Sequence, residues 1–163
     1  MHLLIQPLQS SQIDSLVDLA EIIWHKHYDS IIGSDQVNYM LAKFQNKKAI
    51  LQQQADGYQY YAAIENSILV GYFSIKEEEN NSLFISKFYL SDQVRGKGYG
   101  RDMLQFIESL AINSEKRSLD LTVNKFNSAF DIYLKLGFEK VGNAQFDIGG
   151  GYIMDDFVLK KRL

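Results

Sequence analysis

The sequence has no cysteine among its 163 residues, only one proline and only three histidines. The absence of cysteine excludes disulfides, thiolate metal sites and a cysteine nucleophile. His2, His25 and His27 are too few and too clustered to suggest a zinc site, so we expect no metal. No apolar run approaches the roughly 20 residues that cross a bilayer, and the first residues lack the pattern of a signal peptide. We therefore expect a cytoplasmic protein with no membrane partner.

A strong charge of either sign is also missing. The formal net charge is −3 and the pI is about 5.6. A nucleic-acid-binding protein normally shows a basic excess, so we expect no nucleic-acid partner. Hydrophobic residues make up 46% and charged residues 23%, which is ordinary for a globular protein. Without repeats or linker-like segments, the whole range 1–163 is predicted to form one domain.

The apolar pattern changes period along the chain, which predicts both helices and strands. Strands are expected over 2–8, 58–64, 68–75, 83–90, 119–124, 138–147 and 151–161. Helices are expected from Ile13 with Ser10 or Ser11 as its cap, after Ser34, over 103–111 and over 127–136, and a further helical piece is allowed over 47–55. The resulting order is β-α-α-β-β-β-α-β-α-β-β. It predicts an α/β (α+β) fold, with a mixed, mostly antiparallel central sheet flanked by helices.

A glycine-rich turn separates the strand at 83–90 from the long helix after it. Gly96, Gly98 and Gly100 let the backbone approach a ligand closely, and Arg95, Lys97 and Arg101 add positive charge. Free N–H groups at a helix start favour an anion, so the turn predicts a pyrophosphate site. The alternative is a plain flexible turn with solvated basic residues. The Walker spacing is absent, and a dinucleotide fingerprint would follow the first strand of its unit.

Two sequence blocks have a defined residue spacing. The first, Gln93-x-x-Gly96-x-Gly98 followed by Gly100, is similar to the acetyl-CoA motif of the GNAT family of N-acetyltransferases. The segment Asn127-x-Ala129-x-x-x-Tyr133-x-x-x-Gly137-Phe138 resembles its second block, although one residue instead of two separates Asn127 from Ala129. Asn124 is therefore an alternative to Asn127. The resemblance extends over nearly the whole chain and implies the acyl-CoA N-acyltransferase fold.

The resemblance also implies an enzyme that transfers an acetyl group from acetyl-CoA to an amine. Main-chain groups of Phe88, Tyr89 and Leu90 would hold the pantetheine arm, and Asn127 would bond to it. Tyr133 would lie near the sulfur and protonate the departing thiolate. The cofactor residues implied by the turn are Gln93, Val94, Arg95, Gly96, Lys97, Gly98, Tyr99, Gly100 and Arg101.

The chemistry of these residue types agrees with that assignment. A phenol of pKa about 10 can supply a proton to a thiolate whose thiol has a pKa of about 8.5. Tyr133 could instead be a core aromatic. A lysine-like amine is almost fully protonated at pH 7, so a base or a proton path is needed. The strand at 83–90 has no Glu, and the base is left open among Glu65, Glu77, Asp155, Asp156 and His25. Without cysteine, direct attack in a ternary complex is favoured over an acyl-enzyme.

The acceptor pocket of the family is usually built from the first two helices and the last hairpin. This implies His27, Tyr28 and Asp155 as substrate residues. Residues 146–156 are similar to the closing hairpin of PaiA-like polyamine acetyltransferases, which favours a polyamine or another small cationic amine. The acidic run 77–79 is normally a solvated turn, but it and the pair Asp155-Asp156 would attract such an amine if they faced the pocket. A peptide or ribosomal-protein N-terminus is the alternative acceptor.

A non-catalytic acetyl-CoA-binding module and a purely structural turn are the alternatives to an enzyme. A homodimer is a further expectation, because relatives are often dimers.

Overall fold

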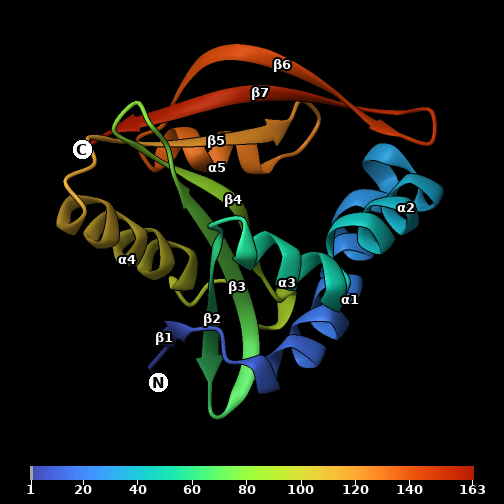
Figure 1. The fold of residues 1–163 in the computed structure, drawn as a ribbon, viewed down its shortest axis with the longest axis horizontal. Coiled ribbons are helices and arrows are strands. Elements are labelled where there is room, and N and C mark those ends of the chain that lie inside the picture. Colours follow the sequence, from blue (N-terminus) through green and yellow to red (C-terminus); the bar gives the residue numbers. More distant parts are fainter. Residues whose placement is uncertain (1) are drawn as a thin grey trace.

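Residues 2–163 are described by a computed structural model, in which one seven-stranded sheet runs through the molecule (Figure 1). The strands lie in the order β1-β2-β3-β4-β5-β7-β6. Neighbouring strands are antiparallel except for β4 and β5, which are parallel. The prediction of a mixed, mostly antiparallel sheet is therefore confirmed. The strands are β1 (Leu4–Pro7), β2 (Gln59–Glu65), β3 (Ile68–Glu77), β4 (Ser82–Leu90), β5 (Ser118–Asn124), β6 (Glu139–Gly149) and β7 (Tyr152–Arg162).

Five α-helices and two 3₁₀ turns connect these strands in the described chain. They are η1 (Ser10–Gln12), α1 (Ile13–Ile32), α2 (Ser34–Phe44), α3 (Lys47–Ala55), η2 (Asp92–Val94), α4 (Tyr99–Asn113) and α5 (Ala129–Lys135). The predicted order is confirmed, with α3 as an additional helix at the place where the sequence allows one. The expected serine cap of α1 is wrong. Ser10 and Ser11 lie inside η1, so Gln12 takes the N-cap position, and no side chain caps the helix there.

Helices cover both faces of the sheet, and the sheet separates two apolar cores. Successive side chains of a strand point to opposite faces. Tyr72 therefore packs with α1, α2 and α3, while Phe73 packs on the other face with α4. Tyr72 and Phe73 are both fully buried. A side chain on β4, β5 or β7 thus faces either the α1–α3 side or the α4–α5 side of the sheet.

Candidate active site

The parallel pair β4 and β5 separates partway along its length. The two strands pair only from Ser82 with Ser118 to Ile85 with Leu121. Beyond that point β4 continues to Leu90 and β5 continues to Asn124 without further pairing between them in the described chain. A register shift between β3 and β4 leaves Ser86 as an extra residue at the point of separation, and such a bulge bends its strand. A wedge with an unpaired edge of β4 therefore opens in the middle of the sheet.

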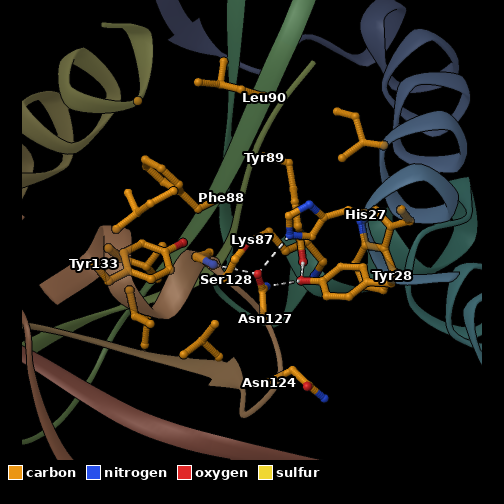
Figure 2. Close-up of a pocket in the computed structure, with 18 of the residues that line it drawn as sticks. His27, Tyr28, Lys87, Phe88, Tyr89, Leu90, Asn124, Asn127, Ser128 and Tyr133 are labelled. Carbon is orange, nitrogen blue, oxygen red and sulfur yellow. Dashed lines mark hydrogen bonds between the residues drawn. The ribbon is translucent and has the colours of Figure 1, made fainter. Parts of the chain in front are cut away.

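A cavity of about 1200 Å³ fills this wedge and extends on both sides of it. At one end it is lined by the glycine-rich turn after β4. At the other end it is lined by α1, α2 and the last two strands. Phe88 and Leu90 lie along β4 between these ends, and Figure 2 shows both labelled beside the open space. The cavity therefore joins the predicted cofactor region to the predicted acceptor region.

The glycine-rich turn presents free amide groups to one end of the cavity. Gly96 and Gly98 have φ values of +79° and +82°, and a Cβ atom at either position would meet no atom within 4 Å. Among residues 2–163, no protein acceptor is found for the backbone N–H groups of residues 96–101, whereas Asp102 N–H already bonds to Gly98. These amides lie at the start of the 15-residue helix α4, where the dipole favours an anion. The turn has the chemistry and the space that a diphosphate needs.

Two of the three basic side chains of the turn, Arg95 and Lys97, are paired with carboxylates. Arg95 lies 2.6 Å from Asp92, which Lys26 also contacts at 2.9 Å. Lys97 bonds to both carboxylate oxygens of Glu65 at 3.0 Å. Arg101 lines the cavity and has no ion-pair partner in the described chain. The sequence alone could not show that Arg101 is the unpaired residue of the three. The carboxylates that pair with Arg95 and Lys97 lie in the preceding turn and on β2.

The remaining residues of the turn divide into buried and exposed side chains. Val94 and Tyr99 are 4% exposed and pack in a small core with Val70, so only their main chains can serve a ligand. Tyr99 donates its hydroxyl proton to Glu65. Gln93 is exposed and lines the cavity, as does Gly100.

Tyr133 of α5 lines the middle of the cavity from the α4–α5 side. Its ring packs edge-on against Phe88 at 6.1 Å and Phe138 at 5.6 Å between centroids. Figure 2 shows its hydroxyl directed into the open space rather than into the core. Burial, with a smaller contribution from Tyr28, raises the pKa of Tyr133 above the ordinary value of 10.0. The phenol therefore keeps its proton at neutral pH and is available as a donor.

Asn127 connects the loop before α5 to helix α1. Its Oδ1 accepts from the Ala129 N–H at 2.9 Å and lies 3.0 Å from His27 Nε2. Its Nδ2 donates to the Tyr28 hydroxyl at 3.4 Å, and that hydroxyl lies 3.3 Å from the hydroxyl of Tyr89 (Figure 2). Asn127 is only 5% exposed. Its oxygen thus has two protein donors, and one Nδ2–H remains for a ligand.

Asn124, the alternative to Asn127, makes a different interaction. Its Oδ1 accepts from the Phe126 N–H at 2.9 Å. It lines the cavity, but Figure 2 shows its side chain directed away from Tyr133 and Asn127. Asn127 is therefore the better placed of the two.

Of the candidate bases, only Asp156 lines the cavity. Glu65 is bound by Lys97 and Tyr99. Glu77 is paired with Lys116 at 3.6 Å, and His25 with Asp29 at 2.8 Å. Neither they nor Asp155, which lies 2.8 Å from Lys125, belong to the cavity lining. The predicted substrate residue Asp155 thus lies outside the lining, whereas its neighbour Asp156 lies in it, because adjacent residues of a strand face opposite sides.

Asp156 is a buried carboxyl group on β7. It is 2% exposed, and its Oδ1 has no hydrogen-bond partner in the described chain. Burial raises its pKa from 3.8 to about 6, with a smaller increase from Asp155, while a hydrogen bond with Thr122 opposes this change. Such an unpaired carboxyl in a cavity can accept a proton near neutral pH.

Sequence reasoning gave no role to Lys87 of β4. Its Nζ donates to Gln53 Oε1 at 3.0 Å and lies 5.6 Å from the centre of the Tyr60 ring. Burial lowers its pKa from 10.5 to about 8.

The acidic run at residues 77–79 begins at the last residue of β3 and does not line the cavity, so it does not attract a cationic amine into it. None of the described helices is long and apolar enough to cross a membrane. Residues 2–163 contain no group of three or more His, Asp or Glu side chains that could hold a metal.

The fold and the site define a class of protein that transfers acyl groups from a coenzyme A thioester. The family model described as the acetyltransferase (GNAT) domain matches residues 30–152. The chain therefore belongs to the GNAT family and is an acetyl-CoA-dependent N-acetyltransferase.

Solved structures agree with this fold over the whole chain. The PaiA N-acetyltransferase from Thermoplasma acidophilum, in complex with coenzyme A, has a TM-score of 0.84 at 21% identity, with all of both chains covered. A GCN5-related N-acetyltransferase from Rhodopseudomonas palustris has a TM-score of 0.85 at 13% identity, covering 100% of this chain and 97% of its own. A ribosomal-protein-alanine N-acetyltransferase from Brucella melitensis has a TM-score of 0.67 at 20% identity, covering 98% and 99%. No curated protein matches the sequence significantly.

Proposed function

We propose that this enzyme acetylates the primary amine of a small molecule by direct attack in a ternary complex. The observation that carries the proposal is the continuous cavity from the free amides of the turn, past Tyr133, to the unpaired carboxyl of Asp156. The absence of cysteine removes the most common nucleophile for an acyl-enzyme route.

The chain's own groups can hold acetyl-CoA along this path. The amides of residues 95–101 and the side chain of Arg101 would take the diphosphate. Of these amides, the Arg95 N–H also donates to Asp92 O at 3.3 Å. The unpaired edge of β4 beside Phe88, Tyr89 and Leu90 would hydrogen-bond to the pantetheine amides, as strands do with each other. When bound, acetyl-CoA supplies an activated thioester.

Asp156 and Tyr133 have complementary states at neutral pH. Asp156, with a pKa of about 6, is mostly ionised at pH 7 and can accept the proton of an incoming ammonium group. Tyr133 remains a neutral phenol and can donate a proton at the thioester sulfur. One group therefore accepts a proton where the amine enters, and the other donates one where the thiolate leaves.

Two classes of acceptor amine have support from the site or from the solved structures. The likeness to PaiA and the presence of Asp156 support a polyamine, whereas Asp155 and the acidic run 77–79 lie outside the cavity lining. The likeness to a ribosomal-protein-alanine N-acetyltransferase supports a peptide N-terminus. Both are included in the test below, and a homodimer stays a prediction.

The test is the release of free thiol from acetyl-CoA in the presence of a panel of primary amines. The panel contains amino acids, polyamines, simple alkylamines and short peptides with a free N-terminus. We expect steady turnover with at least one small amine and no burst of an acyl-enzyme. Tight binding of acetyl-CoA by calorimetry, without turnover of any amine, would contradict catalysis. Turnover of peptides alone would contradict a small acceptor.

A further inference from the structure

The acceptor half of the cavity contains a lysine without an acidic partner. Lys87 lines the cavity from β4, one residue before Phe88 in the unpaired part of the strand. Its ammonium group has three N–H donors, and one of them is used by Gln53. In the described chain no carboxylate lies within ion-pair distance of it. The group is therefore a half-buried cation whose other N–H donors are free to bind a ligand.

Lys87 and Asp156 lie on the same face of the sheet. Lys87 contacts Gln53 of α3, so its side chain is on the α1–α3 side. On β7, Phe157 packs with Phe130 of α5, which puts the adjacent Asp156 on the α1–α3 side as well. Strand β5 lies between β4 and β7, so strand spacing sets the two backbones at least about 10 Å apart. Both side chains therefore line the cavity from the α1–α3 side, one on each side of the wedge.

The other charged groups of the cavity belong to its cofactor half. Asp92 lies beside Lys26 and Arg95, and Asp102 is in the first turn of α4. The acceptor half thus offers one cation and one carboxyl group, on opposite sides of the wedge. A polyamine would bring a second ammonium group toward Lys87, and like charges in a partly buried site repel strongly. An acceptor with one amine and one anionic group matches both charges.

Resting on the acetyl transfer proposed above, we propose that the acceptor is a small amine that also carries a carboxylate, as an amino acid does. Lys87 holds the carboxylate while the amine lies toward Asp156. Lys87 is then a specificity residue. An ion pair with the substrate would also compensate the cost of burying its charge.

The experiment compares amino acids with their carboxamides, which have the same shape but lack the negative charge. Thiol release gives kcat and KM for the common amino acids, their carboxamides and spermidine. The wild type is expected to use at least one amino acid at least tenfold better, in kcat/KM, than its carboxamide and better than spermidine. The carboxamide's amine loses its proton more easily, so this comparison works against the proposal and makes a positive result stronger.

Two substitutions identify the residue responsible. Lys87→Met keeps the apolar stem and removes the charge, so the preference for the carboxylate should fall at least tenfold, mainly through KM. Lys87→Glu should reverse the preference toward carboxamides and polyamines. Lys76→Met is the matched control, because Lys76 lies on the neighbouring strand over the Tyr58 ring and outside the cavity lining. It should keep the wild-type preference.

Equal or better use of carboxamides or spermidine by the wild type would overturn the proposal, as would an unchanged preference in Lys87→Met. If Lys87→Glu does not fold, Lys87→Met still decides the question. A complete lack of turnover with every amine, despite acetyl-CoA binding, is the separate result that overturns the proposed function and this inference with it. Turnover without a carboxylate preference overturns the inference alone.

Discussion

The imidazole of His27 and the carboxamide of Asn127 lie 3.0 Å apart, although one hundred positions separate them in the sequence. The Ala129 N–H also points at Asn127 Oδ1, so this atom is an acceptor, and His27 must donate from Nε2. The contact fixes the end of α1 against the loop that starts α5. It thereby sets the relative positions of two elements that line opposite sides of the cavity.

We expect His27→Ala to destabilise the fold by about 1 kcal/mol, because it removes one donor from a nearly buried acceptor. His27→Gln should retain most of that stability, since the glutamine amide can place an N–H near the position of Nε2. Urea unfolding curves of the three proteins measure the difference. Equal losses in both variants would show that ring packing against Tyr28, and not the hydrogen bond, matters.

Gly98→Asp should weaken acetyl-CoA binding by more than tenfold. The substitution places a carboxylate among the free amides of the turn, where the diphosphate is expected, and it also forces a side chain into a φ of +82°. Gly151→Asp is the control for backbone strain, because Gly151 has a φ of +80° and equally open surroundings in the β6–β7 turn. Calorimetric titration with coenzyme A measures both. Unchanged affinity in Gly98→Asp would refute the diphosphate site.

Local features of the sequence predicted most of the fold and the position of the glycine-rich turn in it. Strand alternation, helical periodicity and the glycine spacing depend on residues close in sequence, and they located the turn before α4 correctly between strand and helix. The predicted start of α5 at residue 127 is two residues early, because Asn127 lies before the helix and its Oδ1 accepts from the N–H of Ala129, the first helical residue.

The acceptor half could not be predicted in the same way, because it depends on which face each strand residue takes. Asp155 and Asp156 are adjacent and chemically identical, and only the pairing of β7 with β5 and β6 decides which one faces the cavity. Lys87 was equally ambiguous, because the register shift at Ser86 changes the face of the residues that follow it. The burial of Asp156 and Lys87 marks them as residues of the site, and this burial cannot be read from the sequence.

Tyr133→Phe should lower kcat by about a hundredfold or more, the usual size of a lost proton donor, and leave coenzyme A affinity nearly unchanged. The ring keeps its contacts with Phe88 and Phe138, so stability should change little. Steady-state kinetics and coenzyme A titration measure the two effects. A parallel loss of folding stability and cofactor affinity would instead assign the ring to the core.

Asp156→Asn should remove most of the activity while stabilising the protein. The folded-state pKa of about 6 lies above the ordinary 3.8, so the fold favours the protonated carboxyl group, and its ionisation costs stability as the pH rises through this range. The variant should therefore match the wild type below about pH 4. It should exceed the wild type by on the order of 1 to 3 kcal/mol above pH 6.

The same ionisation should govern the rate of the wild type. Because the base must be unprotonated, kcat/KM is expected to fall tenfold per pH unit below about pH 6, and Asp156→Asn should lose this limb of the profile. Asp155→Asn distinguishes the neighbouring acid, since Asp155 is paired with Lys125 outside the cavity lining and its variant should keep the wild-type limb. Melting curves from pH 3 to 9 and rates from pH 4 to 9 provide both measurements. A wild-type limb retained in Asp156→Asn would exclude Asp156 as the base, because a group that no longer titrates cannot set the pH dependence of the reaction.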